Sequence, residues 1–318
     1  ADASSLRSWL LGEDADPSIR WQVLRDLADA DPGAVGAERA RVATEGWGAR
    51  LLAMQTPDGL WDGGVYNPSW STPEQRAASP GQPWTGTFHT LKLLTELGAP
   101  PGHPAVQQAI ARTRDGARWD DDPFFAGETE ECVNGGVLLI GSVYGVRVDA
   151  IAERLVTQQQ PDGGWNCDRD RGSVRSSFHS TICVLEGLLA YEHATGGTQA
   201  PRGSVAGHLL ERSLFRRATT GAVVDPDFLR FSFPTRWFYD VLRALDHLRA
   251  TGAPPDPRSS DALQLVGDRR RSDGTWPSEN THPGEVHFDL EDGEGRPSRW
   301  NTLRALRVLR WAGDDVEL

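Results

Sequence analysis

The sequence predicts an all-α protein, a closed (α/α)6 barrel in which six helical hairpins form an inner and an outer ring of helices. Three observations favour this fold class. A short turn motif that ends in tryptophan recurs along the chain, apolar segments with helical spacing recur with it, and the repeats extend almost from one end of the sequence to the other.

The turn motif is most regular in three copies, which read QTPDGLW (Gln55–Trp61), QQPDGGW (Gln159–Trp165) and RRSDGTW (Arg270–Trp276). Each copy follows an apolar segment with helical spacing, and its Asp-Gly dipeptide favours a tight turn. A looser copy, RDGARW, spans Arg114–Trp119. We interpret each copy as a turn that follows a helix.

The predicted inner helices share a second pattern. In each, a Ser, Thr or Pro precedes a singled-out residue, and apolar residues then follow at helical spacing. Ser and Thr cap helix starts, and Pro is tolerated in a first helical turn. The residues interpreted as equivalent are Trp21, His89, Cys132, His179, Trp237 and Trp300. Each interval between them has room for an inner helix, an outer helix and a loop.

Closure of the ring is favoured by the two ends of the chain. The first repeat begins near the N-terminus, and the last ends shortly after Trp311. Neither end carries the polar capping repeat that an open solenoid needs. We therefore expect one toroidal domain over residues 1–318.

Composition narrows the function classes. The formal net charge of -12 argues against nucleic-acid binding and against an anionic membrane surface. No apolar run is long enough to span a bilayer. The start ADASSLRSWLL lacks a basic region and a long apolar core, and three cysteines do not make a disulfide framework. We expect a cytoplasmic protein with free, buried or metal-bound thiols.

The Gln-x-x-Asp-Gly-x-Trp turns resemble the repeat of the squalene–hopene cyclase and protein prenyltransferase β-subunit superfamily, over nearly the whole chain. The prenyltransferases hold a catalytic zinc with an Asp-x-Cys pair on one inner helix and a His at the start of a later one. The resemblance implies the ligands Glu130, Cys132 and His179, with Glu130 standing where the family has aspartate.

Carboxylate, thiolate and imidazole groups all suit Zn²⁺. Cys167, in the loop before the His179 helix, is a candidate fourth ligand, and it would make the site more closed. Packing roles for Cys132 and His179 are the alternative. We interpret Cys183 as a core residue.

The sequence departs from both branches of the family. Its acidic runs, Asp120–Asp122, Asp225–Asp227 and Asp289–Asp292, do not match the Asp-x-Asp-Asp motif of the cyclases. No basic residue stands just before the Glu-x-Cys pair, and Val133 follows it where the prenyltransferases have Tyr. A diphosphate beside three aspartates would be repelled. We therefore expect neither standard prenyl diphosphate transfer nor standard cyclisation.

Further site residues follow from the expected rim of the barrel. Trp21, Trp237 and Trp300 are predicted to line the mouth and bind substrate. Arg236 and Tyr239 are additional substrate-binding candidates, with helix packing as the alternative. The candidates for a general acid or base are Asp168, Asp121 and His89. The long loop 277–296 is either a lid over the rim or a plain surface loop.

These residues predict a zinc-dependent enzyme that acts on a small, largely apolar substrate of terpenoid or polyketide type. The first alternative is a binding or scaffold protein that a metal stabilises without catalysis. The second is a peptide-modifying toroid enzyme; lanthionine cyclases also combine a toroid with a Cys/His zinc site, but this chain lacks their adjacent Cys-His pair. The expected partner is a small molecule, and the sequence indicates no oligomeric state.

Overall fold

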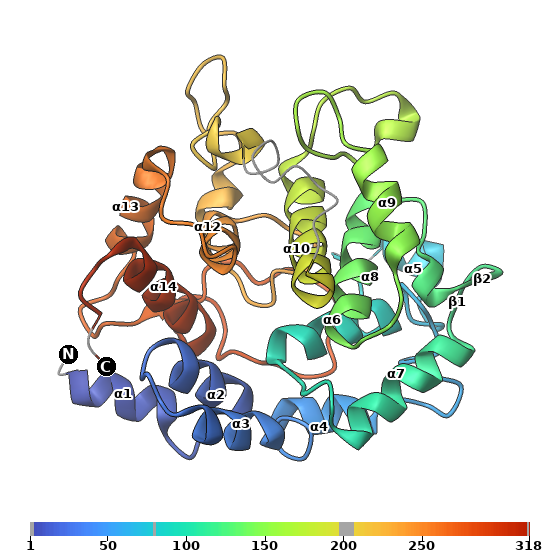
Figure 1. Cartoon of the computed structure of the whole chain (residues 1–318), viewed down its shortest axis with the longest axis horizontal. Coiled ribbons are helices and arrows are strands. Elements are labelled where there is room, and N and C mark those ends of the chain that lie inside the picture. Colours follow the sequence, from blue (N-terminus) through green and yellow to red (C-terminus); the bar gives the residue numbers. More distant parts are fainter. Residues whose placement is uncertain (1–2, 79–80, 197–206, 317) are drawn as a thin grey trace. The chain divides into compact units, whose positions relative to one another are not determined.

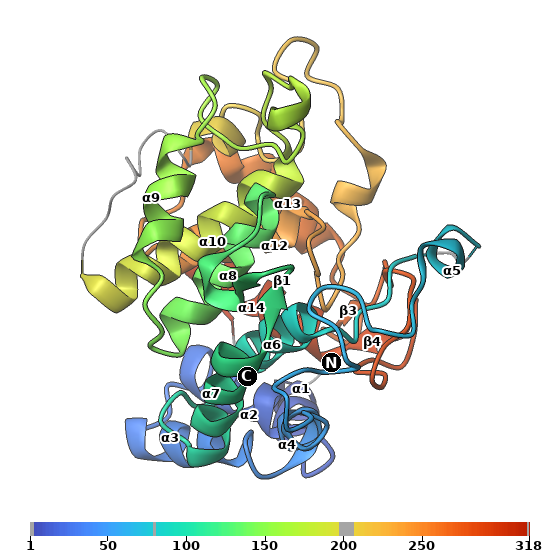
Figure 2. The same cartoon turned by 90° about the vertical axis from the view of Figure 1, so that its right-hand side faces the viewer.

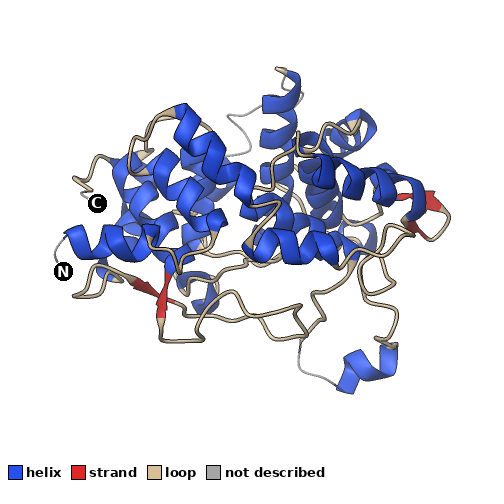
Figure 3. Cartoon of the chain, turned by 90° about the horizontal axis from the view of Figure 1, so that it is seen from below, coloured by secondary structure: helices blue, strands red, loops and turns tan. Residues whose placement is uncertain are grey.

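The computed structural model describes residues 3–78, 81–196, 207–316 and 318, and helices dominate it (Figure 3). The helix-rich class that the sequence predicts is confirmed. The α-helices are α1 (Ala3–Leu11), α2 (Pro17–Asp26), α3 (Pro32–Arg41), α4 (Gly46–Ala53), α5 (Pro73–Ala78), α6 (Thr87–Leu97), α7 (Pro104–Gly116), α8 (Glu131–Val143), α9 (Asp149–Thr157), α10 (Phe178–Thr195), α12 (Val241–Ala250), α13 (Ser260–Asp268) and α14 (Arg299–Ala312).

Short elements connect these helices. The 3-10 helices are η1 (Phe124–Ala126), η2 (Arg169–Arg171), η3 (Pro226–Leu229) and η4 (Pro257–Ser259). Two antiparallel strand pairs join β1 (Arg118–Trp119) to β2 (Asp122–Pro123) and β3 (Trp276–Pro277) to β4 (Pro297–Ser298). No helix in the described part of the chain has the length and apolar character needed to cross a membrane.

The residue contacts divide the chain into two compact units. The first comprises Ala1–Arg41, Ala206–Thr281 and Leu290–Leu318, and the second comprises Val42–Val205 and His282–Asp289. The first and last parts of the sequence therefore fold into the same unit, where α2 contacts α14. A closed ring of six hairpins in one domain stays a prediction.

The tryptophans of the regular turn motif join one helix to the next. Trp61, Trp165 and Trp276 are fully buried. Each indole N–H donates over 2.7 Å to a carbonyl ten residues earlier, in α4, α9 and α13 respectively. Each backbone N–H donates to a threonine hydroxyl of the following helix, in α6, α10 and α14. The repeated motif is thus a structural device that fixes each helix pair.

Backbone conformation explains why the motif contains an Asp-Gly dipeptide. Gly59, Gly163 and Gly274 all adopt positive φ angles of 82–88°, a region that L-residues with a side chain rarely enter. At Gly59 a Cβ atom would also lie 2.2 Å from the carbonyl oxygen of Arg112, so the turn approaches α7 directly. The looser copy differs, because the indole of Trp119 donates to Phe124 at the end of the β1–β2 pair.

In the second unit, α8 and α10 lie side by side (Figures 1 and 2). Glycines permit this close contact. A Cβ atom on Gly135 of α8 would lie 2.4 Å from the carbonyl oxygen of Cys183, and one on Gly187 of α10 would lie 2.3 Å from that of Gly135. The approach brings the start of α8 next to the loop that leads into α10.

The equivalence predicted for the inner-helix residues holds at three positions and is wrong at two. Cys132, His179 and Trp300 are each the second residue of a helix. Trp21, however, is the fifth residue of α2, and Trp237 lies before α12.

Aspartate caps explain both errors. The carboxylate of Asp16 accepts from the N–H of Ser18 over 2.9 Å, so α2 begins at Pro17. The carboxylate of Asp240 accepts from the N–H of Arg243 over 2.7 Å, so α12 begins after Trp237 rather than before it. The remaining residue of the set, His89, is the third residue of α6.

Candidate functional site

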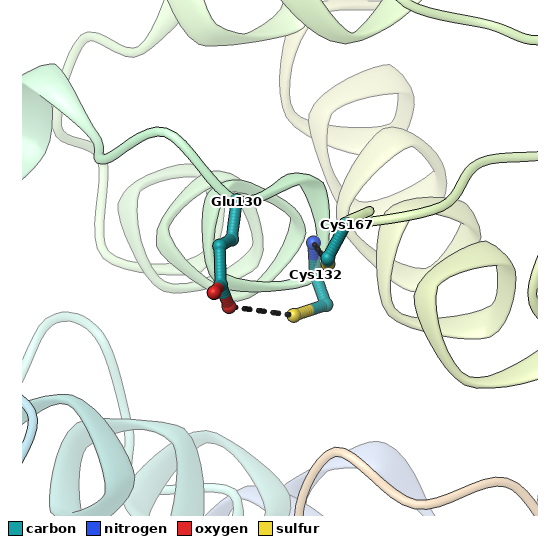
Figure 4. Close-up of side chains that lie close together, drawn as sticks. All are labelled: Glu130, Cys132 and Cys167. Carbon is teal, nitrogen blue, oxygen red and sulfur yellow. Dashed lines mark hydrogen bonds between the residues drawn. The ribbon is translucent and has the colours of Figure 1, made fainter. Parts of the chain in front are cut away.

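Three of the four predicted metal ligands come together at the start of α8 in the second unit (Figure 4). Glu130 is the N-cap residue of α8, Cys132 lies in its first turn, and Cys167 lies in the loop before η2. A carboxylate oxygen and the two sulfur atoms all lie within 4.8 Å of one another. The spacing suits groups that share one ion.

Direct hydrogen bonds hold this group, which we call the Glu-Cys-Cys cluster (Glu130, Cys132 and Cys167). The backbone N–H of Cys132 donates to the sulfur of Cys167 over 3.2 Å. The thiol of Cys132 donates to the Glu130 carboxylate over 3.8 Å. Ser180 lies in the first turn of α10, and its hydroxyl is 3.3 Å from the Cys167 sulfur. The same hydroxyl oxygen accepts a hydrogen bond from the backbone N–H of Cys167. Two helix starts therefore fix the position of Cys167.

The turn before α8 is fixed by polar contacts of its own. The side-chain amide of Asn134 accepts from the N–H of Glu128 over 2.8 Å and donates to its carbonyl over 2.7 Å. The buried carboxylate of Glu131 pairs with Arg169 of η2 over 2.7 Å. This ion pair ties the loop that carries Cys167 to the helix that carries Cys132.

Charge in the cluster is unevenly distributed. The hydrogen bond to Cys167 and burial raise the pKa of the Cys132 thiol well above its usual range. Hydrogen bonds from Cys132 and Ser180 lower the pKa of Cys167. Burial, together with nearby Glu128, raises the pKa of Glu130. Three groups that repel one another as anions would gain from a cation among them.

His179, the fourth predicted ligand, occupies a different position. It is the second residue of α10 and directly precedes Ser180, which contacts Cys167. Among the described residues, its ring nitrogens are not part of the group whose ligand atoms lie within 4.8 Å. A ligand role for His179 stays a prediction.

His89 lies in an aromatic surrounding in the same unit. It is buried, and its Nε2 atom lies 2.8 Å from the Gln82 amide nitrogen. The rings of Tyr66, Trp84 and Phe88 lie 4.6, 5.0 and 5.1 Å from the His89 ring. The role of His89 as a general acid or base stays a prediction, and the geometry shows a buried imidazole held by an amide.

Tyr66 is a site residue that the sequence did not reveal. Burial raises the pKa of its hydroxyl strongly, and the groups at Cys132 and Glu130 act in the same direction. A hydrogen bond from Gln82 acts in the opposite direction. Tyr66 lies in a loop between α4 and α5 with no periodic pattern, so only the tertiary structure brings it here.

The two aspartates proposed for acid–base chemistry lie at the surface. Asp121 is exposed in the turn between β1 and β2. Asp168 directly follows Cys167, is also exposed, and pairs with Arg171 over 3.0 Å. Neither belongs to the Glu-Cys-Cys cluster. Their catalytic roles stay predictions.

The aromatic candidates of the first unit pack within that unit. The Trp21 ring lies under the guanidinium groups of Arg25 and Arg39, at 4.5 and 4.8 Å. Trp300 is buried and stacks on Phe233 with ring centroids 3.9 Å apart.

Trp237 and its neighbours likewise have partners inside the unit. Trp237 stacks on Phe238 at 3.8 Å. Tyr239 is buried, and its hydroxyl donates to the carbonyl of Leu214 over 2.5 Å; Arg236 is also buried. For Tyr239 these contacts match the helix-packing alternative. Substrate binding by the three tryptophans, Arg236 and Tyr239 stays a prediction.

The middle of the long loop 277–296 belongs to the second unit, although both ends of the loop belong to the first. Trp84 donates its backbone N–H to the carbonyl of Glu285 over 2.8 Å and its indole N–H to that of Pro283 over 3.0 Å. Thr90 contacts His287 over 2.9 Å. The segment His282–Asp289 is therefore anchored at the start of α6, beside His89, and its role as a lid stays a prediction.

An open pocket of ≈ 460 Å³ lies elsewhere on the second unit. It is lined by residues of α7, by Phe125 of η1 and by Tyr144–Arg147, which follow the C-terminal end of α8. The Glu-Cys-Cys cluster lies at the N-terminal end of the same helix, about 17 Å away along its axis. The pocket is therefore separate from the cluster.

Comparison with known proteins gives distant similarities only. No family model matches the chain, and no curated protein does. The type II terpene cyclase MstE from Scytonema, in its apo form, is similar at 16% identity and a TM-score of 0.42 over 96% of this chain and 95% of that one. A variant of MstE in complex with its substrate, geranylgeranyl dihydroxybenzoate, is similar at 15% identity and a TM-score of 0.41 over 98% and 94%. Similarities this distant carry no argument about fold or function.

Proposed function

We propose that the chain is a zinc-dependent enzyme that acts on a small, largely apolar substrate of terpenoid or polyketide type. The observation that carries this proposal is the Glu-Cys-Cys cluster, whose three ligand atoms lie within 4.8 Å of one another although Cys132 and Cys167 are 35 residues apart. Two sulfurs and a carboxylate oxygen favour zinc over calcium or magnesium, which prefer oxygen ligands alone.

The number of protein ligands would decide between a catalytic and a structural role for the metal, and His179 is the candidate fourth ligand. Structural zinc sites have four protein ligands, whereas catalytic sites have three and keep one position open. Glu130, Cys132 and Cys167 would hold the ion here. Bound zinc would act as a Lewis acid on a polar group of the substrate.

The aromatic surrounding of His89 supports an apolar substrate. Tyr66, Trp84 and Phe88 gather in the same unit as the cluster, and aromatic faces bind apolar chains and favour positive charge. The Gln82 amide holds His89 by a hydrogen bond and also contacts the Tyr66 hydroxyl. Tyr66 would orient a polar group of a substrate bound near the cluster.

The first test measures the metal. Protein purified without chelator is analysed for zinc, and cobalt is then substituted to record its visible spectrum. The expected result is one zinc per chain and intense cobalt bands typical of a tetrahedral site with thiolate ligands. Cys183→Ser, which changes a cysteine outside the cluster, is the matched control for Cys132→Ser and should keep the spectrum.

The second test measures the reaction. A panel of small, largely apolar compounds of terpenoid and polyketide type is the suitable probe, because this is the proposed substrate class. Zinc-loaded protein should convert a member of the panel to a product, and both metal-free protein and Cys132→Ser should not. Zinc bound by four protein ligands, with neither binding nor conversion of apolar probes, would instead support the metal-stabilised binding protein.

A further inference from the structure

The second unit contains all three cysteines of the chain, in two different environments. Cys132 and Cys167 are half-buried, and their sulfur atoms lie within 4.8 Å of each other. Cys183 is buried on α10 with 4% of its surface exposed. None of the three, all of which lie in the described part of the chain, is in a disulfide. A small oxidant from solvent therefore has access to the pair before it has access to Cys183.

We propose that Cys132 and Cys167 form an oxidative modification site, at which a peroxide converts the metal-free thiol pair into a disulfide. The proposal that these two thiols react with each other rests on the distance between their sulfur atoms and on their exposure. The competition between metal and oxidant rests on the proposed zinc site, because the same two sulfurs would hold the ion.

The contacts of Cys167 make it the sulfur that reacts first. Its Sγ atom accepts from the backbone N–H of Cys132 over 3.2 Å and contacts the Ser180 hydroxyl over 3.3 Å. The Cys132 N–H belongs to the first turn of α8, so this helix start holds the Cys167 sulfur beside that of Cys132.

The reaction balances with peroxide as the oxidant. The Cys167 thiolate attacks one peroxide oxygen, the O–O bond breaks, and Cys167 becomes a sulfenic acid as the first water forms. The Cys132 sulfur then attacks the Cys167 sulfur, the S–S bond forms, and the S–O bond breaks to release the second water. The two thiols lose two electrons and two protons in total, and the peroxide is reduced to two waters.

The sulfur atoms of the pair must move closer for a disulfide to form. A disulfide requires the sulfurs to approach to about 2.05 Å. Cys132 is fixed on a helix, whereas Cys167 lies in the loop between the buried Trp165 and η2. Closure therefore requires the Cys167 loop to move toward α8 and to change its contacts with the Cys132 N–H and the Ser180 hydroxyl.

The experiment exposes metal-free and zinc-loaded full-length protein to hydrogen peroxide at low molar excess. Free thiols are counted after denaturation, and intact and peptide masses are measured without reductant. The expected metal-free product has lost two of its three thiols and about 2 Da, and its peptide map links Cys132 to Cys167. Cys183→Ser is the matched control and should form the same link.

Variants separate the two steps. Cys132→Ser should stop at the sulfenic acid, which gains about 16 Da and is trapped by dimedone on Cys167. Retention of all three thiols, a link to Cys183, or a link between two chains would overturn the proposal. These readouts do not require enzymatic activity, so a variant without activity still gives an answer.

The zinc arm distinguishes this inference from the proposed function. Bound zinc should slow the loss of thiols, because coordinated sulfurs are less available to peroxide. Zinc that binds without slowing the oxidation would show that the metal lies elsewhere. That result would overturn the proposed competition between zinc and peroxide for the two sulfurs. If the protein binds no zinc, the proposed function fails, whereas a Cys132–Cys167 link would still establish the oxidation site.

Discussion

The backbone N–H of Cys132 donates to the sulfur of Cys167 over 3.2 Å, so the first turn of α8 fixes a side chain from a loop 35 residues later in the chain. Ser180 of α10 contacts the same sulfur. The side-by-side packing of α8 and α10, which Gly135 and Gly187 permit, thus sets the position of a candidate metal ligand. Fold and site are linked here through two helix starts.

The first prediction concerns metal affinity. Cys167→Ser should weaken zinc binding by more than the roughly 10- to 100-fold that loss of an outer partner costs, because a thiolate ligand is removed outright. Competition with a chromogenic zinc chelator measures the change. Cys183→Ser should leave the affinity unchanged. Equal affinities for the two variants would exclude Cys167 as a ligand.

The second prediction concerns the repeat tryptophans. Trp165 is fully buried and joins Leu155 of α9 to Thr181 of α10. Trp165→Ala should lower the free energy of unfolding by about 3–5 kcal/mol through the cavity it leaves. Trp165→Phe keeps most of the ring and should cost about 1–3 kcal/mol, because the Leu155 carbonyl loses its donor.

Urea unfolding curves measure both costs. Trp70→Phe is the control, since Trp70 is 46% exposed and should change stability by less than about 0.5 kcal/mol. An equal effect at the two positions would contradict a structural role for the motif.

Local signals predicted much of this molecule. The Asp-Gly-x-Trp turns were recognisable because a positive φ angle demands Gly59, Gly163 and Gly274 wherever the turn recurs. The residues of the Glu-Cys-Cys cluster came instead from the resemblance to the prenyltransferase zinc ligands, with Cys167 added as a thiol in the loop before the His179 helix.

Other features depended on interactions that local patterns do not encode. The starts of α2 and α12 are set by the carboxylates of Asp16 and Asp240. The sequence pattern had instead assigned helix starts to Ser, Thr and Pro. Tyr66 meets the His89 ring from a loop without periodicity. The anchoring of His282–Asp289 on the second unit depends on backbone carbonyls, which every residue possesses.

The third prediction concerns a buried ion cluster in the first unit. Arg307 of α14 donates to Asp246 of α12 over 2.8 Å and to Asp26 of α2 over 3.1 Å. Burial works to raise the pKa of Asp246, but the guanidinium groups of Arg307 and Arg249 hold it well below its ordinary value of 3.8. Asp246→Asn should cost about 3–5 kcal/mol at pH 7, because Arg307 loses a charged partner while buried.

The pH dependence of this effect has a defined sign. A carboxyl whose pKa is depressed by folding stabilises the protein above about pH 3.8, and the stabilisation is lost as the pH falls further. The difference between the native protein and Asp246→Asn should therefore shrink below pH 4. Asp227→Asn, at an exposed pair with Arg230, is the control and should cost less than about 1 kcal/mol. A gap that stays constant to pH 3 would refute the assignment.

The last prediction concerns Glu291, which stabilises the start of α14. Its carboxyl oxygen accepts from the Ser298 hydroxyl over 2.6 Å and from the Trp300 N–H over 3.3 Å. Burial raises its pKa from 4.5 to about 7, against the effect of those hydrogen bonds. Because folding favours the protonated form, its contribution to stability is complete below pH 4.5 and is lost as the pH rises toward 7. The loss should be on the order of 1–3 kcal/mol.

Glu291→Gln cannot ionise and should not show this decline, whereas Glu294→Gln, in the exposed part of the same loop, should retain it. Urea unfolding at several pH values between 4.5 and 8 gives the comparison, and identical profiles for the native protein and Glu291→Gln would show that Glu291 does not titrate in this window.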